Sequence, residues 1–265
     1  MYEFEYHRPA SLDDAAKMLG NEDAKLVAGG MTLIPTLKQR LAKPSDLVDL
    51  GALSQLKGIT EEGDAVVIGA MTRHADVNRS PIVQRGIPAL AAMAGLIGDP
   101  AVRNRGTIGG SIANNDPAAD YPGAVVALNA TVRTNKREIA ADDFFTGLFE
   151  TALEPGEIIT AVKFPKVATA NYQKFRNPAS RYAIVGVFVA RGPAGIRVAV
   201  TGAGACVFRQ TEMEQALGRS FTPDAIKDIK QPQDDLNSDI HASAEYRAHL
   251  VTVMARRAVA ACASA

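Results

Sequence analysis

The sequence predicts a mixed α+β protein with two lobes of α/β type followed by a smaller α+β domain. Within residues 1–50, short apolar runs alternate with stretches in which apolar residues recur at helical spacing, which is typical of a β-α-β-α-β unit. From about residue 54 to 165, strand-like runs are separated by turns, a helical stretch and a segment rich in Gly, Asn, Asp and Pro. After Pro165, two apolar runs precede a polar stretch and a closing helix, and 265 residues leave room for more than one domain.

The first unit begins with a strand that Pro9 closes. Ser11, with Asp14 three residues later, predicts a helix N-terminus, because a hydroxyl and a carboxylate at this spacing can cap the first turn. The second strand ends at the glycine pair 29–30, and Thr32 is expected to cap the helix that follows. In order, the expected elements are a strand at 4–8, a helix at 12–19, a strand at 25–28, a helix at 33–41 and a strand at 47–50.

The rest of the chain alternates less regularly. A turn is expected at 61–64, a helix beginning at Asp120 or Tyr121, and a linker at 166–171. The further expected elements are strands at 65–69, 131–134, 158–164, 183–190 and 196–201, and helices at 88–97, 120–128 and 243–262.

Charge and cysteine content exclude several functions. Lys and Arg together number 29, as do Asp and Glu, and this balance does not favour a protein that binds nucleic acid by neutralising phosphates. Cys206 and Cys262 are isolated, which rules out a disulfide scaffold, a four-cysteine zinc site and an iron–sulfur cluster held by this chain alone. The acidic N-terminus lacks the apolar region of a signal peptide, and no apolar run is long enough to cross a bilayer. A cytoplasmic protein without membrane insertion is therefore expected.

Two glycine pairs mark candidate anion-binding loops, AGGMT at 28–32 and TIGGS at 107–111. Each pair follows a strand-like run, and glycine lets backbone N–H groups approach an anionic ligand without a Cβ in the way. Taken singly, each pair is explained as simply by an ordinary turn, since the chain has 22 glycines. Neither pair has the spacing of a Rossmann motif or a P-loop, so the standard nucleotide-binding motifs are absent.

Asn and Asp side chains crowd into residues 114–120 around Pro117. Asp116, directly before this proline, suits a helix N-cap with proline at the first helical position, although paired carboxylates also serve metal binding or acid–base chemistry. Asp120 is well placed to accept hydrogen bonds from ribityl or ribose hydroxyls. The four histidines show no metal-ligand spacing and no nucleophile motif occurs, so no catalytic and no metal-binding residue is expected.

In this order, these segments resemble the FAD-binding medium subunits of the molybdenum hydroxylases, of the carbon monoxide dehydrogenase type, and more distantly the FAD domain of xanthine dehydrogenase. The resemblance covers essentially the whole chain and is most specific in the TIGG…DPAAD segment. The segments that carry it are YHRPASLDDAAKML (6–19), LVAGGMTLIPTLKQRL (26–41), IGDPAVRNRGTIGGSIANNDPAADYP (97–122), FFTGLFETALEPGEIITAV (144–162), YQKFRNPASRYAIVGV (172–187) and DIHASAEYRAHLVTVMARRA (239–258).

The resemblance implies a two-lobed FAD-binding domain of the PCMH or vanillyl-alcohol-oxidase-like type, with FAD held between the lobes. This domain would span 1–167, with lobe one at about 1–53 and lobe two at about 54–167. Residues 168–265 would form a smaller α+β C-terminal domain of the carbon monoxide dehydrogenase flavoprotein type.

The resemblance also implies how FAD is held. The loops 28–32 and 107–111 would cradle its pyrophosphate through backbone amides. Asp120 would lie near the sugar-like chain of the flavin, and Ile158 or Ile159 would contact the adenine side through its backbone.

Lys174 and Tyr182 match positions beside the flavin in relatives, although a solvated strand-end lysine and a packing tyrosine are simpler alternatives. The sequence departs from the family at two places. Met31 and Thr32 stand where relatives commonly have His-Ser, which removes any role of that histidine, and Asp116 stands where a small residue is usual. Neither departure touches a glycine. The implied cofactor-binding residues are Ala28, Gly29, Gly30, Met31, Thr32, Thr107, Ile108, Gly109, Gly110, Ser111, Asp120, Ile159, Lys174 and Tyr182.

The implied role is that of an electron-transfer subunit in a heterotrimer. A molybdopterin-binding large subunit would oxidise the substrate, a small subunit would relay electrons through [2Fe–2S] clusters, and FAD in this chain would pass them to a quinone, NAD or a cytochrome. Two heterotrimers would form a dimer. A stand-alone FAD oxidoreductase of the vanillyl-alcohol-oxidase type is the alternative, although the residues after Pro165 leave little room for its substrate-cap domain. A non-catalytic nucleotide-binding or scaffold protein is a third interpretation.

Overall fold

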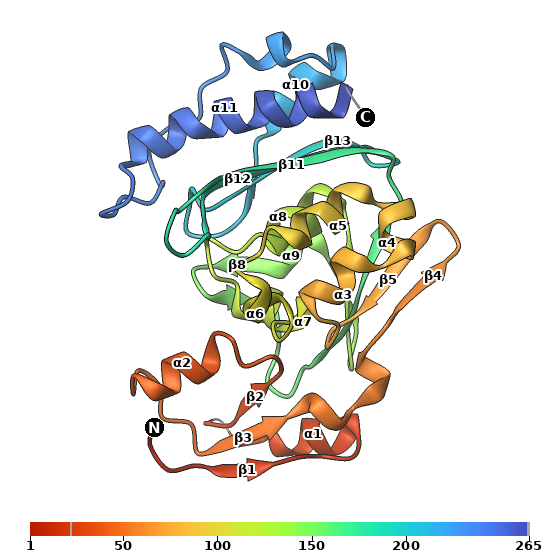
Figure 1. Cartoon of the computed structure of the whole chain (residues 1–265), viewed down its shortest axis with the longest axis vertical. Coiled ribbons are helices and arrows are strands. Elements are labelled where there is room, and N and C mark those ends of the chain that lie inside the picture. The colour runs from red at the N-terminus through yellow and green to blue at the C-terminus, as the bar shows by residue number, and fades with distance from the viewer. Residues whose placement is uncertain (22, 264–265) are drawn as a thin grey trace.

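The computed structural model describes residues 1–21 and 23–263 and shows three blocks along its long axis (Figure 1). A small α/β lobe lies at one end, and a middle lobe built on a five-stranded sheet lies next to it. A four-stranded sheet covered by helix α11 (Ala244–Ala263) lies at the other end. This arrangement confirms the predicted fold class. No helix in the described ranges is both long enough and apolar enough to cross a membrane.

Lobe one has the β-α-β-α-β order that the apolar spacing predicts. Its strands form a parallel sheet with β3 between β1 and β2. The Ser11 hydroxyl accepts a hydrogen bond from the Asp14 amide, so the predicted N-cap is confirmed. The cap predicted at Thr32 is wrong, because its side chain makes no capping hydrogen bond. The elements are β1 (Glu5–His7), α1 (Leu12–Met18), β2 (Lys25–Val27), α2 (Leu33–Lys38) and β3 (Asp46–Asp49).

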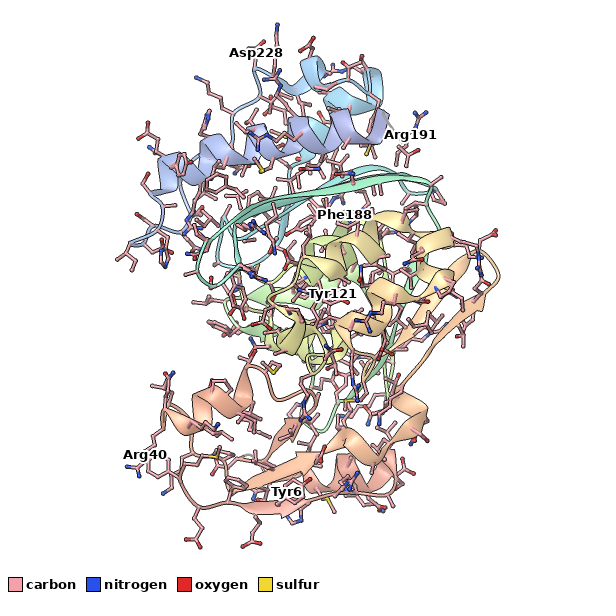
Figure 2. All side chains as sticks on the ribbon, in the orientation of Figure 1. Tyr6, Arg40, Tyr121, Phe188, Arg191 and Asp228 are labelled. Atoms are coloured by element: carbon pink, nitrogen blue, oxygen red, sulfur yellow. The ribbon has the colours of Figure 1, made fainter. Side chains whose placement is uncertain are left out.

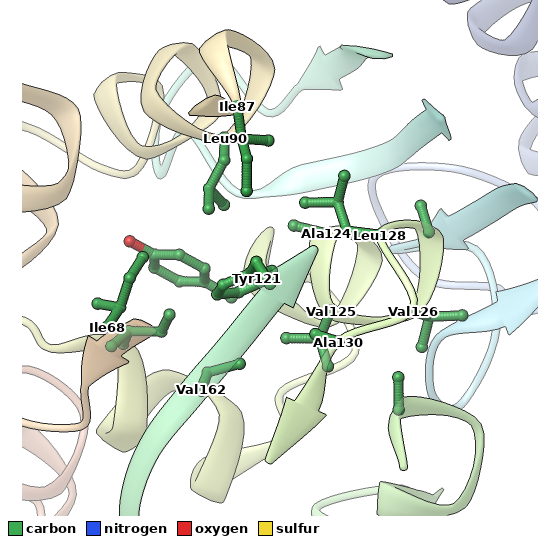
Figure 3. Close-up of a cluster of buried hydrophobic side chains, with 14 of the residues drawn as sticks. Ile68, Ile87, Leu90, Tyr121, Ala124, Val125, Val126, Leu128, Ala130 and Val162 are labelled. Atoms are coloured by element: carbon green, nitrogen blue, oxygen red, sulfur yellow. The ribbon is translucent and has the colours of Figure 1, made fainter. Parts of the chain in front are cut away.

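The middle lobe is organised around β10 (Ile159–Pro165), the central strand of an antiparallel sheet ordered β4-β5-β10-β6-β7. Helices cover this sheet, and Figure 3 shows the buried cluster in which Leu90, Tyr121 and Val162 take part. The other strands are β4 (Ile59–Glu62), β5 (Ala65–Gly69), β6 (Thr131–Thr134) and β7 (Glu138–Ala140), with a hairpin of β8 (Phe145–Gly147) and β9 (Glu150–Thr151). The helices are α3 (His74–Arg79), α4 (Pro81–Gly86), α5 (Pro88–Gly95), α6 (Pro100–Arg103), α7 (Ile108–Asn114), α8 (Tyr121–Ala127) and α9 (Ala141–Phe144).

The C-terminal block explains why the longest apolar run of the chain does not alternate. Strand β12 (Ala183–Gly192) pairs with two neighbours, and both faces of its sheet are covered. Val187 packs in the cluster shared with α11, whereas Phe188 packs in the core of the middle lobe, at the boundary seen in Figure 2. The other elements are β11 (Thr169–Arg176), β13 (Gly195–Thr201), β14 (Phe208–Arg209) and α10 (Thr211–Arg219).

Some local expectations are corrected by the structure. The predicted linker at 166–171 is shorter, because β11 already begins at Thr169 and pairs with β12. The predicted turn at 61–64 is confined to residues 63–64, since the two glutamates before it belong to β4. Helices α3, α4 and α6 were not predicted, because four to six residues are too few for a helical period to appear in the sequence.

An ion-pair network joins the C-terminal block to the middle lobe. Asp142 in α9 pairs with Arg197 on β13 and with Arg209 on β14, the latter at 3.2 Å. Arg197 also donates to the carbonyl oxygen of Val126 at 2.8 Å, and its side chain is buried. Arg209 pairs with Glu214 at 2.6 Å. One carboxylate of the middle lobe therefore serves two arginines of the C-terminal block.

Replacing Asp142 with alanine is expected to lower the free energy of unfolding by about 1–3 kcal/mol, because it leaves the buried guanidinium of Arg197 without its carboxylate. Urea unfolding followed by circular dichroism measures this loss. The neighbouring exposed residue gives a matched control, since Asp143→Ala should change the free energy by less than about 0.5 kcal/mol. Equal losses in the two variants would show that the network does not stabilise the junction.

Candidate functional site

The AGGMT loop, residues 28–32, connects β2 to α2 and carries backbone donors without partners. The amides of Gly29, Gly30, Met31 and Thr32 donate no hydrogen bond within the described part of the chain. Gly30 has φ +72°, a left-handed conformation that glycine adopts without strain. Consecutive free N–H groups in a loop of this kind make a concave site for an anion.

The TIGGS segment, residues 107–111, was predicted to be a loop, and this local structure is wrong. Thr107 is the N-cap of α7, and the following residues form its first turn. The amides of Ile108 and Gly109 donate to the carbonyl oxygens of Thr72 and Ala70 at 3.1 and 2.8 Å.

The next amide of this turn, that of Gly110, donates to the Thr107 hydroxyl at 3.2 Å, and the Ser111 amide donates to the Thr107 carbonyl at 3.0 Å. The amides of residues 108–111 are therefore used inside the chain, and those of residues 29–32 are free.

The two glycine segments lie against each other. A Cβ built on Gly29 would lie 2.1 Å from the carbonyl oxygen of Arg105 and 2.8 Å from the Cα of Gly106, so no side chain fits there. A Cβ built on Gly110 would lie 3.5 Å from the Cβ of Ala28. Segments about eighty residues apart are thus packed backbone to backbone, and glycine is needed for this close approach.

Asp120 is the centre of a buried polar cluster at the start of α8. It makes no helix cap; its carboxylate pairs with the Lys174 ammonium at 2.9 Å and accepts from the Tyr172 hydroxyl. Only 3 % of the Lys174 side chain and 5 % of the Asp120 side chain are exposed. The alternative of a solvated Lys174 is therefore excluded. Lys174 also donates to the Leu96 carbonyl at 3.1 Å.

The electrostatics of this cluster follow from its burial. Loss of hydration raises the pKa of Asp120, and the Lys174 ammonium and the Tyr172 hydroxyl oppose this shift. Burial also raises the pKa of Tyr172 well above its ordinary value, with the neighbouring carboxylate adding to the effect. The tyrosine therefore stays protonated and acts as a hydrogen-bond donor.

Tyr182 links the two parts of the site. It lies in the turn between β11 and β12, and 45 % of the residue is exposed. Burial, and then the carboxylates of Asp116 and Asp120, raise the pKa of its phenol, whereas a hydrogen bond with Thr32 lowers it. Tyr182 therefore contacts the AGGMT loop and lies close to both acids. Core packing alone does not explain this position.

The remaining candidates lie at the edge of this site or apart from it. Asp116 was expected to cap a helix, and that prediction is wrong: its carboxylate accepts from the Ala118 amide at 2.9 Å in a turn, and no helix starts at Pro117. Ile159 is buried in the core of the middle lobe, and Ile158 in the core of lobe one. Neither isoleucine side chain joins the Asp120 cluster.

Sequence reasoning missed two contributors, Tyr172 and the Leu96 carbonyl. Tyr172 could have been found, because it lies two residues before Lys174 on a strand and so points to the same face. The carbonyl carries no sequence signal. Within the described residues, no three His, Cys, Asp or Glu side chains are placed to hold a metal ion.

The site can therefore hold a ligand with an anionic part and a hydroxylated part. Free amides face the first part, and a buried carboxylate can accept from the second. FAD has such a pyrophosphate and such a ribityl chain. The free amides, together with the glycine contacts that a Cβ would fill, fit this cofactor.

Comparison with known proteins gives a consistent result over the whole chain. Residues 2–167 match the family model described as FAD binding domain in molybdopterin dehydrogenase, and residues 170–262 match the CO dehydrogenase flavoprotein C-terminal domain. The carbon monoxide dehydrogenase medium chain of Hydrogenophaga pseudoflava is 38 % identical, with 97 % of this chain and 96 % of the relative covered. The nicotine 6-hydroxylase medium subunit of Paenarthrobacter nicotinovorans is 38 % identical, with 96 % and 95 % covered. A solved structure of the Hydrogenophaga pseudoflava carbon monoxide dehydrogenase superposes with a TM-score of 0.90 over 99 % of this chain and 98 % of that one.

Proposed function

Because this chain belongs to the family of FAD-binding medium subunits of the molybdenum hydroxylases, we propose that it transfers electrons from [2Fe–2S] clusters of a partner chain to an external acceptor. Membership of this family makes it an oxidoreductase subunit with FAD as its cofactor. The observations that carry the proposal are the free amides of the AGGMT loop and the buried, lysine-paired carboxylate; the loop and the carboxylate both interact with the side chain of Tyr182. Bound FAD supplies a carrier that exchanges one or two electrons at a time.

Each residue of the site has a proposed task. The amides of AGGMT bind the pyrophosphate, and Gly30 gives the loop its left-handed turn. The carboxylate of Asp120 accepts from flavin hydroxyls, and Lys174 keeps it ionised and in place. Tyr182 closes the site beside the flavin.

The TIGGS segment, residues 107–111, has a supporting task in this proposal. The amides of residues 108–111 are already bonded within the chain, so the segment contributes the close packing of Gly110 against the AGGMT loop and the Thr107 and Ser111 hydroxyls. Ile159 is proposed to border the adenine side through its backbone.

The proposed assembly has a molybdopterin-binding large subunit and a [2Fe–2S] small subunit, arranged as a dimer of heterotrimers in the cytoplasm. Two relatives are medium subunits or chains of named dehydrogenases or hydroxylases, which supports a multi-subunit complex. The two isolated cysteines of this chain leave the clusters to a partner. The proposed domain limits remain 1–167 and 168–265.

The stand-alone FAD oxidoreductase is less well supported. This chain covers nearly the full length of the medium chains that it matches, and the two family models that it matches describe a FAD binding domain and a CO dehydrogenase flavoprotein C-terminal domain. A non-catalytic scaffold protein has no need for a buried carboxylate–lysine pair beside free loop amides.

A rapid-mixing experiment tests the proposal. The chain with bound FAD should show no bleaching of flavin absorbance when substrate is added, because its described residues include no metal site to activate an organic substrate. The assembled complex, with its molybdenum and iron–sulfur chains, should show substrate-dependent bleaching. Extraction should release about one FAD per chain and no FMN, as expected for a single cofactor site. Rapid bleaching of the isolated chain would refute the subunit role and favour the stand-alone enzyme.

A further inference from the structure

The side chain of His74 lies next to the place where the two glycine segments meet. His74 is the first residue of α3, and α3, α6 and α7 lie at the end of the middle lobe that faces lobe one (Figure 1). Its amide donates to the carbonyl oxygen of Gly106 at 3.0 Å, and only 5 % of the residue is exposed. The site described above gives this buried histidine no task.

Gly106 contacts both His74 and the AGGMT loop. A Cβ built on Gly106 would lie 2.5 Å from the Nε2 atom of His74 and 2.8 Å from its Cδ2 atom, so the edge of the imidazole ring lies against this glycine. The Cβ built on Gly29 would lie 2.8 Å from the Cα of Gly106. In a close-packed interior, a shift of the ring is passed on to the backbone that it touches. The ring therefore acts on the AGGMT loop by way of Gly106.

The surroundings of the ring favour a neutral imidazole. Its Nδ1 atom has no hydrogen-bond partner among the described residues, and neither has the hydroxyl of Tyr121, whose ring centroid lies 5.3 Å from that of His74. Both nitrogens of an imidazolium are donors, so protonation would leave a charged donor at Nδ1 away from water and without an acceptor. A protonated ring is therefore driven out of its contact with Gly106 and toward water.

The charges near the ring act in the same direction. Loss of hydration, and then the guanidinium of Arg103 on α6, lower the pKa of His74 to about 4. Burial raises the pKa of the Tyr121 phenol on α8, which therefore stays protonated. Helix α5, which packs against α3, has no ionisable side chain. The other charged residues of α3, of α4 and of the segment around Gly106 are exposed, and they are Arg73, Asp76, Arg79, Arg85 and Arg105.

We propose that His74 is a positioning residue of the FAD site: its neutral ring holds Gly106 against the AGGMT loop, and protonation of the ring weakens FAD binding. The inference rests on the proposed function, in which this loop binds the pyrophosphate. When the ring moves toward water, the backbone at 105–106 loses its support, and the free amides of the loop no longer converge on one anion.

The Kd of FAD as a function of pH tests this inference. Equilibrium dialysis of the assembled complex gives the Kd, and circular dichroism of the same samples reports the fold. A ring that has an ordinary pKa of about 6.5 in water and a lower pKa when packed takes up a proton as FAD leaves, so acidification between these two pKa values raises the Kd. His74→Gln keeps a neutral polar side chain that cannot be protonated. From pH 7 to pH 5 the rise in Kd should be about tenfold larger in the native complex than in His74→Gln.

Two comparisons isolate the contribution of His74. Asp120, whose pKa burial raises, also binds a proton in acid, but it is present in both complexes and its contribution cancels. His249→Gln is the matched control, because His249 is exposed on α11, and this variant should have the native pH dependence.

A size exchange tests the contact itself at neutral pH. Gly106→Ala places a methyl group 2.5 Å from the Nε2 atom of His74 and should raise the Kd of FAD about tenfold. Adding His74→Ala removes the ring and should recover most of this loss. The Gly106 pair decides the question alone if His74→Gln does not assemble.

Equal pH dependence in the native complex and His74→Gln overturns the positioning role of His74, and so does a Gly106→Ala variant that His74→Ala does not rescue. Either result leaves FAD binding and electron transfer intact. A native complex that contains no FAD at neutral pH overturns the proposed function itself.

Discussion

Gly29→Ala is expected to reduce bound FAD to less than about a tenth of the native content, because the new methyl group has no space to occupy. Its carbon would lie 2.1 Å from the Arg105 carbonyl oxygen, and backbone atoms cannot move aside as a flexible side chain can. The AGGMT loop must then separate from the segment before α7, and its free amides no longer converge on one anion. FAD content is measured by absorbance after release from the purified complex.

Gly218→Ala is the matched control for this experiment. Gly218 lies in α10, and a Cβ there meets nothing within 4 Å. This variant should keep its FAD and become more stable by about 0.5–1 kcal/mol, since alanine is favoured over glycine in a helix. Circular dichroism should be native-like for both variants. Full FAD content in Gly29→Ala would show that the AGGMT loop is not the pyrophosphate cradle.

The sequence predicts lobe one well and the site only in part, for a physical reason that the two glycine segments illustrate. Lobe one is a local unit in which each strand and helix is specified by nearby apolar residues. The TIGGS segment contains the same glycine signal as AGGMT. Its amides are nevertheless taken by carbonyls of Thr72 and Ala70, thirty-odd residues earlier in the chain. Which amides are free depends on such long-range pairing, and no local pattern records it.

Lys174 makes the same point for a side chain. A lysine on a strand is expected in solvent, and only the fold shows that it reaches a carboxylate fifty-four positions away. Burial makes the Lys174–Asp120 pair important for stability. Removing one partner of a buried ion pair leaves an unpaired charge away from water, whereas removing one partner of an exposed pair costs little stability. The family resemblance pointed to Lys174 and Asp120 separately; the structure pairs them.

Lys174→Met is expected to destabilise the protein by about 3–5 kcal/mol at neutral pH, because it leaves the Asp120 carboxylate buried without its ammonium partner. The loss should shrink as the pH falls. Burial already raises the pKa of Asp120, and removing the cation raises it further. The unfolded pKa of an aspartate is about 3.9, and an acid whose pKa is higher in the folded state binds more protons when folded. Lowering the pH through the range between these two pKa values therefore favours folding of the variant. Urea unfolding at several pH values measures the effect.

A second substitution separates the structural task of this pair from its task toward FAD. In the double variant Asp120→Asn with Lys174→Met the buried charge is gone, so most of the stability should return. The part of the pH dependence of stability that Asp120 causes in Lys174→Met should vanish. FAD should still bind weakly, because the ionised acceptor proposed for the flavin hydroxyls is lost and hydrogen bonds to charged groups are the stronger ones.

Lys17→Met is the control, since its pair with Asp14 is exposed at 3.7 Å and should contribute less than about 0.5 kcal/mol. A double variant that regains both stability and FAD would assign the pair to folding alone, and a pH-independent loss in Lys174→Met would show that Asp120 is not the group left unpaired.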